Sequence, residues 1–327
     1  MMDFWLPLVF VGVMGLALLM YVVLDGYDLG VGMLLPFADE HEKDPMIASI
    51  GPFWDANETW IVLGVGVLLI AFPQAHGIIL TTLYLPATFM LMGLVLRGIA
   101  FDFRIKAGES QKGMWNRVFS VGSLIAALAQ GWMLGSYVTG LDASLFGLLF
   151  SLLTAICLPA LYVMLGAIWL MIKSEPELAL KARGWAKFAW LPMGLALLLI
   201  SMATPLVSAR IADKWFSLPE ALWVSPIPIF ALLCYGWIGM ALFERARYRP
   251  VLMFFALAAI CVMAALGLAY SVYPDIIIGR LQIHEAAAAT ESLLFVFWGV
   301  VVTLPLILGY TFFVYRIFNA GALKQGY

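Results

Sequence analysis

Long uninterrupted runs of apolar residues recur along the whole chain, and they constrain its fold more than any other feature. A membrane-crossing helix needs about 20 predominantly apolar residues. Nine stretches meet that requirement, namely 5–25, 54–72, 77–101, 115–138, 143–172, 188–209, 223–243, 251–273 and 291–315. The runs are continuous and do not alternate with polar residues, which disfavours a transmembrane β-barrel. The sequence therefore predicts an all-α polytopic membrane protein with nine transmembrane helices.

The composition agrees with a membrane protein and excludes several other classes. Hydrophobic residues make up 64% of the chain and charged residues 12%, whereas about a quarter of a soluble domain is charged. The net charge of −2 gives no reason to expect a nucleic-acid partner. Cys157, Cys234 and Cys261 all lie inside apolar runs, so we interpret them as core residues and expect no disulfide or metal site. The N-terminal stretch lacks a basic region and a cleavage site, and we expect it to remain as the first helix.

The basic residues predict the orientation of the chain. Most of the 18 Lys and Arg residues fall in loops on one side of the nine helices, while Arg210, Lys214 and Arg280 fall on the other side. Basic loops usually face the cytoplasm. We therefore expect a cytoplasmic (inner) membrane protein with its N-terminus outside and its C-terminus inside. The basic run 245–249 would be an orientation anchor, or a contact for anionic lipid headgroups.

Short turns divide the predicted helices into groups. The turns at 73–76 and 139–142 leave little chain between consecutive runs, so their helices should pack as antiparallel neighbours. We expect a first four-helix bundle in residues 1–138 and a second in 139–273. Residues 274–327 would supply an external segment, a peripheral ninth helix and a cytoplasmic tail.

Charged residues in the first three predicted helices are the chemically distinctive feature of the sequence. They form three clusters: Asp25 with Asp28, Asp55 with Glu58, and Arg97 with Asp102 and Arg104. Residues three apart share one face of a helix, and charges in membrane helices usually face a protein interior, a partner charge or a water path. The predicted topology places all three clusters near the cytoplasmic side. We therefore expect them to converge at one depth.

Two interpretations of these clusters remain open. Closely spaced carboxylates in a poorly solvated place can take up protons near neutral pH, as a proton relay requires. Alternatively, the charges form a structural knot of ion pairs with no proton traffic. In that case Asp55 could cap the second helix, and Arg97 could neutralise an acid or pair with Asp102. The flanking Trp54 and Trp60 would ordinarily be helix-packing or interfacial aromatics.

Several motifs resemble those of one membrane protein family. DGYDLGVGMLLPF (25–37), SIGPFWDANETW (49–60), AFP (71–73) and RGIAFDFR (97–104) occur in the order and spacing of subunit II of cytochrome bd-type quinol oxidases. AQGWMLG (129–135), YVMLGAIWLMIKSEPEL (162–178) and TLPLILGYTFFVYRIF (303–318) extend the resemblance along the chain. The GPFWDANETW and LGAIWL motifs and the short chain resemble the cyanide-insensitive branch. Ala56 and Pro176 stand where the family commonly has Gly.

The resemblance implies a heterodimer with subunit I that oxidises a quinol such as ubiquinol and reduces dioxygen to water. Haem b and haem d would lie in subunit I. Asp28 and Asp55 match the positions of the family's proton-uptake carboxylates in subunit II, and we take Asp25, Asn57 and Glu58 as helpers. Trp60, with Trp54 beside it, would lie near a path for oxygen or solvent. This subunit would also stabilise subunit I.

The histidines support the expectation that this chain binds no haem. His41, His76 and His284 fall in loops or at the ends of predicted helices, whereas haem needs an axial ligand inside the bundle. An apolar groove could hold a quinone or a membrane lipid, and small single-span subunits could bind. Two other functions compete, a proton-coupled secondary transporter and a purely structural scaffold. Transporters place their sites near the midplane between repeats, whereas these charges lie towards one face.

Overall fold

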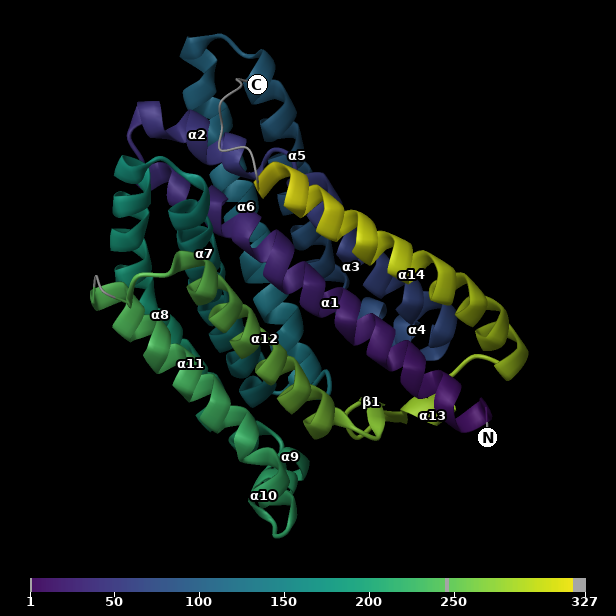
Figure 1. Ribbon diagram of the computed structural model, residues 1–327. Helices are drawn as coiled ribbons and strands as arrows, with labels where there is room; N and C mark the ends of the chain where they lie inside the picture. The colour runs from purple at the N-terminus through teal and green to yellow at the C-terminus, as the bar shows by residue number, and fades with distance from the viewer. Residues whose placement is uncertain (1, 245–246, 320–327) are drawn as a thin grey trace.

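The computed structural model describes residues 2–244 and 247–319 and is almost entirely helical (Figure 1). Within these residues, nine helices are long and apolar enough to cross a membrane. The predicted all-α fold with nine transmembrane helices is therefore confirmed. Arg245 and Lys324, which belong to the predicted cytoplasmic loops and tail, lie outside the described residues.

The long helices alternate in direction and are joined by short elements. The long helices are α1 (Met2–Leu34), α3 (Trp54–Ala71), α5 (Tyr84–Lys106), α6 (Glu109–Val138), α7 (Leu145–Lys173), α8 (Pro176–Val207), α11 (Pro226–Phe243), α12 (Pro250–Val272) and α14 (Thr290–Asn319). The short elements are η1 (Leu35–Phe37), α2 (Glu40–Ile50), α4 (Pro73–Thr82), α9 (Ala209–Phe216), α10 (Glu220–Val224), β1 (Asp275–Ile277), β2 (Leu281–Gln282) and α13 (Ile283–Ala286). β1 and β2 form a small antiparallel hairpin.

Three helix boundaries differ from the prediction, each for a local reason. The Gly-rich continuation after Asp25 is helical, so α1 runs unbroken to Leu34. The predicted third span is divided between α4 and α5, because Pro86 has no N–H to donate to the carbonyl of Thr82 four residues earlier. α8 begins at Pro176, well before the predicted start at 188, since proline suits the first turn of a helix.

α1 lies at the centre of the fold. It packs against α3, α6, α7, α12 and α14, and Figure 1 shows it crossing the molecule with α14 beside it. One apolar core contains buried residues of α1, α6, α7, α8 and α12. This core contains helices from both predicted bundles, residues 1–138 and residues 139–273. The division into 1–138, 139–273 and 274–327 stays a prediction.

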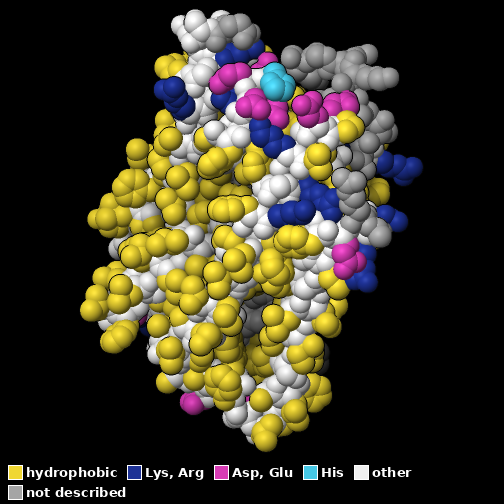
Figure 2. Space-filling view, turned by 90° about the vertical axis from the view of Figure 1, so that its left-hand side faces the viewer, with side chains coloured by type: hydrophobic (Ala, Val, Ile, Leu, Met, Phe, Trp, Pro, Cys, Tyr) yellow, Lys and Arg dark blue, Asp and Glu magenta, His cyan; other side chains and the backbone are white. Residues whose placement is uncertain are grey.

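The two ends of the molecule differ in charge. The end with α2 also carries the turn between α5 and α6 and the last described residues, and the opposite end carries the N-terminus, α9, α10, the hairpin and α13 (Figure 1). Figure 2 shows charged side chains gathered around the α2 end and a mainly hydrophobic flank below them. This flank has the character of a surface that faces lipid. The cytoplasmic orientation of the α2 end stays a prediction.

Glycines let α1 and α7 approach closely where they cross. A Cβ atom on Gly30 would collide with the carbonyl oxygen of Tyr162, and one on Gly166 would lie 2.5 Å from the carbonyl carbon of Gly30. Small residues at such crossings allow backbones to pack directly in membrane proteins. The crossing directly follows Asp25 and Asp28 on α1, so it helps to position the charged residues described below.

Gly30→Ala should therefore destabilise the protein. The added methyl group meets backbone atoms that cannot rotate away, and overpacking of a tight contact costs about 1–3 kcal/mol or more. The measurement is the thermal unfolding midpoint in detergent, with Gly15→Ala as the matched control, because a Cβ on Gly15 of the same helix meets no atom within 4 Å. Equal midpoints for the two variants would contradict this description of the crossing.

Candidate functional site

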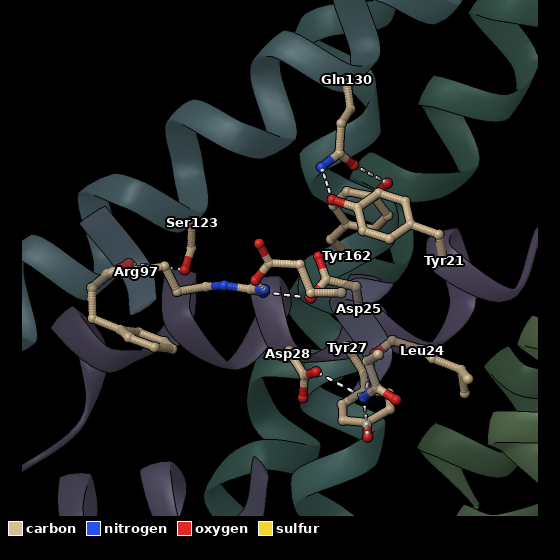
Figure 3. Close-up of polar contacts among 12 residues, drawn as sticks. Tyr21, Leu24, Asp25, Tyr27, Asp28, Arg97, Ser123, Gln130 and Tyr162 are labelled. Carbon is tan, nitrogen blue, oxygen red and sulfur yellow. Dashed lines mark hydrogen bonds and ion pairs between the residues drawn. The ribbon is translucent and has the colours of Figure 1, made fainter. Parts of the chain in front are cut away.

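The candidate site is built on the last third of α1. Asp25 and Asp28 lie three residues apart on this helix, and both side chains are fully buried. Burial of a carboxylate is costly unless a partner charge or hydrogen bonds compensate it. The neighbouring helices α3 and α5 supply those partners, as Figure 3 shows around the two acids.

Arg97 on α5 is the central cation of the site. Its guanidinium Nη1 lies 2.6 Å from Asp25 Oδ1, and its Nη2 donates a 2.8 Å hydrogen bond to Glu58 Oε2 on α3. Arg97 is fully buried, while the Glu58 side chain keeps 28% of its surface exposed. The guanidinium thus joins α1, α3 and α5 through two ion pairs. Glu58 connects this buried site to the surface of the chain.

Asn57 on α3 is the second junction of the site. Its Nδ2 donates hydrogen bonds to Asp28 Oδ2 and to the Tyr27 hydroxyl, each at 2.8 Å. Its Oδ1 accepts a 3.0 Å hydrogen bond from the hydroxyl of Tyr315 on α14, and the hydroxyls of Tyr27 and Tyr315 are 2.6 Å apart. Polar side chains from three helices therefore surround Asp28.

A third polar group lies one helical turn before Asp25. Gln130 on α6 donates a 2.7 Å hydrogen bond to the hydroxyl of Tyr21 and accepts a 2.6 Å hydrogen bond from the hydroxyl of Tyr162 on α7. Tyr21 shares a face of α1 with Asp25, and Figure 3 shows both beside Gln130 and Tyr162. The polar site is thus continuous along this face of α1.

Asp55 does not lie in this buried site, contrary to the expectation that both acids of its motif face inward. Its side chain is exposed in the first turn of α3, and it has no hydrogen bond or ion pair with the described residues. The reason is the position of Asp55 around the helix axis. Asn57 faces the protein interior and lies two residues after Asp55, so the two side chains point about 200° apart around the axis. No side chain caps the start of α3, so the predicted capping by Asp55 is also wrong. The acid still suits the positive end of the helix dipole.

Asp102 and Arg104 are also outside the site. Asp102 is exposed, and Arg97 pairs with Asp25 and Glu58 in place of the predicted partner Asp102. Arg104 forms a separate cluster nearer the α2 end: it ion-pairs with Asp44 on α2, and its Nε donates a 2.6 Å hydrogen bond to Asn116 on α6. Of the seven charges expected at one depth, Asp25, Asp28, Glu58 and Arg97 therefore lie in the buried site, whereas Asp55, Asp102 and Arg104 do not.

Asp44 is held ionised by its surroundings in this outer cluster. Partial burial raises its pKa, but the hydrogen bond and charge of Arg104 and the nearby ammonium of Lys112 outweigh burial and hold the pKa of Asp44 below its usual value. Its carboxylate therefore remains a fixed negative charge near neutral pH. The outer cluster is an ion pair between α2 and α5 that fixes the chain connecting α1 to α3.

The two tryptophans of the motif occupy different environments. Trp60 is buried in the apolar core. Trp54 is partly exposed, its ring centroid lies 5.0 Å from that of Phe101, and the Arg97 guanidinium lies 6.0 Å from its centroid. Trp54 thus covers the side of the Arg97 ion pairs. A role for either residue in access of oxygen or solvent stays a prediction.

Comparison with known proteins shows which family this arrangement belongs to. The family model for cytochrome bd terminal oxidase subunit II matches residues 6–318. The chain belongs to this family. Its membership in the cyanide-insensitive branch remains a prediction.

Relatives of this subunit II match over nearly their whole length. The chain is 26% identical to cytochrome bd-I ubiquinol oxidase subunit 2 of Escherichia coli strain K12, covering 92% of this chain and 91% of that protein. It is 26% identical to cytochrome bd ubiquinol oxidase subunit 2 of Bacillus subtilis, covering 97% and 95%. A chain of the bd oxidase structure from Geobacillus thermodenitrificans has the same fold, with a TM-score of 0.80 at 19% identity, covering 96% of this chain and 98% of that one. This protein is accordingly a subunit of a terminal oxidase.

Several residues of the site could not be recognised from the sequence motifs. Gln130, Tyr162 and Tyr315 all lie within stretches that resemble the family, yet they were not considered as partners of the acids. The available signal was a polar side chain inside an apolar run, which usually faces the protein interior. Asp44 was missed because it lies in a loop between predicted spans, where acids are common.

Proposed function

We propose that this subunit carries protons from the cytoplasm towards a haem-bearing subunit I, which oxidises quinol and reduces dioxygen to water. One observation carries the proposal: the carboxyl groups of Asp25 and Glu58 share the buried guanidinium of Arg97, and the buried carboxyl group of Asp28 lies one helical turn from Asp25 with no ion pair among the described residues. One cation cannot neutralise three carboxylates in a poorly solvated interior. The cluster is therefore suited to hold a proton that can be exchanged.

The exposure of the acids supports a direction of transfer. Asp55 is exposed in the first turn of α3, Glu58 on the same face is half-buried, and Asp25 and Asp28 are fully buried. Protons would enter at Asp55, pass to Glu58 and reach the two acids of α1. Asn57 would hold Asp28 in place rather than carry the proton, because a neutral amide is a poor proton carrier. The Oδ1 atom of Asp28 has no hydrogen-bond partner among the described residues and is the oxygen that would bind the proton.

The exposed acids also indicate where a partner binds. Asp55 and Asp102 are uncovered at the membrane-facing ends of α3 and α5, and a carboxylate in contact with lipid tails is costly. A polar partner that covers this face removes that cost, and the proton path would then run along the boundary between the two subunits, with Asp55 at its cytoplasmic edge. We expect subunit I to lie here and to be stabilised by the contact, and any small single-span accessory subunits to bind elsewhere.

The described residues of this chain do not suit a haem ligand pair. His41 and His284 are exposed, and His76 lies in the short helix α4 at the opposite end from the acids. Family membership implies that haems b and d are held by subunit I, where they would supply electron transfer and oxygen reduction. Within the described residues, no group of three His, Cys, Asp or Glu side chains could hold a metal ion. This chain's own contribution is to bind, hold and pass protons.

The Asp55→Asn variant tests the proposal in the assembled oxidase, purified through a tag on this chain. Oxygen consumption should fall several-fold while the reduced haem spectrum keeps its full amplitude, because the amide cannot take up a proton but preserves the shape of the carboxylate. Asp102→Asn is the matched control, an exposed acid at the same end of the neighbouring helix α5. Unchanged turnover with full haem content rejects entry at Asp55. Purification of the chain without any haem-bearing partner would favour a transporter, and loss of haem in the variant would favour a scaffold.

A further inference from the structure

A cavity lies between α7, α8 and the chain that joins α11 to α12. It is lined by Ser174, Pro176, Ala179, Leu180, Arg183 and Tyr248, and its volume is about 480 Å³. Apolar atoms form most of its surface. The cavity opens where the turn from α7 to α8 meets the start of α12, on the flank of the molecule and near the α2 end. None of its lining residues belongs to the charged site, so the cavity is independent of the proposed proton path.

Arg183 gives this cavity an unusual electrostatic character. The residue is nine-tenths buried, with 9% of its surface exposed, and it forms no ion pair with any described residue. Its Nε donates a 2.9 Å hydrogen bond to the carbonyl of Leu242, near the C-terminal end of α11. Its Nη2 has no hydrogen-bond partner in the described part of the chain. A buried guanidinium without a counter-charge is costly, because a single carbonyl oxygen does not neutralise it.

The surroundings of Arg183 favour an anion. The guanidinium carbon lies 4.9 Å from the ring centroid of Tyr248, which faces the same cavity. The buried Oγ of Ser174, which also lines the cavity, has no hydrogen-bond partner among the described residues. Lys187 lies one helical turn beyond Arg183 on α8 and adds positive charge. The acids nearby are Glu175, Glu177 and Glu244; the first two are exposed, and Glu244 pairs with Arg247 at 3.2 Å.

The apolar lining shows what kind of anion would fit. Pro176, Ala179 and Leu180 present hydrocarbon to the cavity, which a small hydrated anion would leave uncovered. Figure 2 shows Lys and Arg side chains on this flank at the boundary between the charged α2 end and the hydrophobic surface. Phospholipid headgroups occupy that level of a membrane, and basic pockets between transmembrane helices bind anionic ones.

We infer that this cavity binds one anionic phospholipid, with its phosphate on Arg183 and Ser174 and the start of an acyl chain over Ala179 and Leu180. The lipid phosphate supplies the counter-charge that Arg183 lacks among the described residues. The site joins α7 and α8 to the end of α11, so the bound lipid fastens these three helices to one another.

The test measures lipid binding to the purified, delipidated oxidase that contains this full chain. Native mass spectrometry follows the addition of phosphatidylglycerol, phosphatidylcholine or inorganic phosphate. We expect one saturable phosphatidylglycerol, with affinity about tenfold weaker in Arg183→Gln because a charged hydrogen bond is lost. Arg247→Gln is the matched control, because this half-exposed arginine lies at the same end and pairs with Glu244.

A second variant separates binding from folding, since Arg183 also supports the end of α11. Ala179→Trp fills the cavity but leaves Arg183 and its hydrogen bond to Leu242 in place, so it should also lose the bound phosphatidylglycerol. Equal phosphatidylglycerol binding by the wild type and Ala179→Trp would overturn the inference. Equal affinity for phosphatidylcholine, or saturation by inorganic phosphate alone, would also overturn it. None of these outcomes depends on oxygen consumption, so the proton-path proposal can fail without affecting this one.

Discussion

Replacing Arg97 with Met should cost the protein about 3–5 kcal/mol of stability, the largest effect expected for a single side chain of this site. The guanidinium is fully buried and pairs with Asp25 at 2.6 Å and Glu58 at 2.8 Å. Its removal leaves carboxylates in a poorly solvated interior without a partner charge. We expect a large fall in the thermal unfolding midpoint of the purified oxidase, together with a lower yield of assembled complex.

A second substitution distinguishes lost charge from lost packing. In the double variant Arg97→Met with Asp25→Asn, the buried acid that faces the guanidinium is neutral, so part of the lost stability should return. Arg117→Met is the control, because Arg117 is exposed on α6 and its replacement should change the midpoint little. If the double variant were no more stable than Arg97→Met, the ion pair would not be the source of the effect.

Replacing Asp28 with Asn should lower oxygen consumption by about 10²-fold or more, since a positioned proton-transfer group commonly contributes about 10²–10⁴-fold to a rate. Asp28 is fully buried and accepts a hydrogen bond from Asn57 Nδ2. The amide of the variant preserves the shape of the side chain, and its oxygen can accept the same hydrogen bond. It cannot take up and release a proton. The measurements are oxygen consumption by the assembled oxidase and its reduced haem spectrum.

The conservative variant and an outer acid provide the controls for Asp28. Asp28→Glu should recover part of the activity, because it restores a carboxyl group in the same region. Asp44→Asn should leave turnover nearly unchanged, because Asp44 belongs to the outer ion pair with Arg104. Normal turnover in Asp28→Asn would remove Asp28 from the proton path. A fall in turnover that matches a loss of haem would instead assign Asp28 a structural role.

The acids of α1 and α3 differ in how well their burial could be predicted from the sequence. Asp25 and Asp28 were expected inside the protein because charges in apolar runs are costly in lipid, and both are buried. Asp55 satisfied the same rule but is exposed on this chain. Apolar residues occur on all faces of α3. Its sequence therefore does not indicate which face packs against this chain and which face a partner would cover.

The partners of Arg97 also could not be predicted from local spacing. Asp102 lies five residues further along the same helix, about 140° away around the axis, and so cannot meet the guanidinium easily. Asp25 and Glu58 come from α1 and α3. The angle between Arg97 and Asp102 around the helix axis could have excluded Asp102 as the ion-pair partner. The actual partners of Arg97 depend on how α1, α3 and α5 pack.

The sequence by itself determined the membrane environment, the all-α architecture and the nine spans, because the free energy of placing a helix in lipid depends on its length and polarity alone. It also determined family membership through motifs that are local in the chain. Only the tertiary structure decided which polar groups meet: Asn57 with Asp28 and Tyr315, and Gln130 with Tyr21 and Tyr162. It also buried Arg183 without a counter-charge in the part of the chain that the structure describes. These contacts join residues as many as 258 positions apart, and they follow from helix crossing points and rotations that hydrophobicity does not specify.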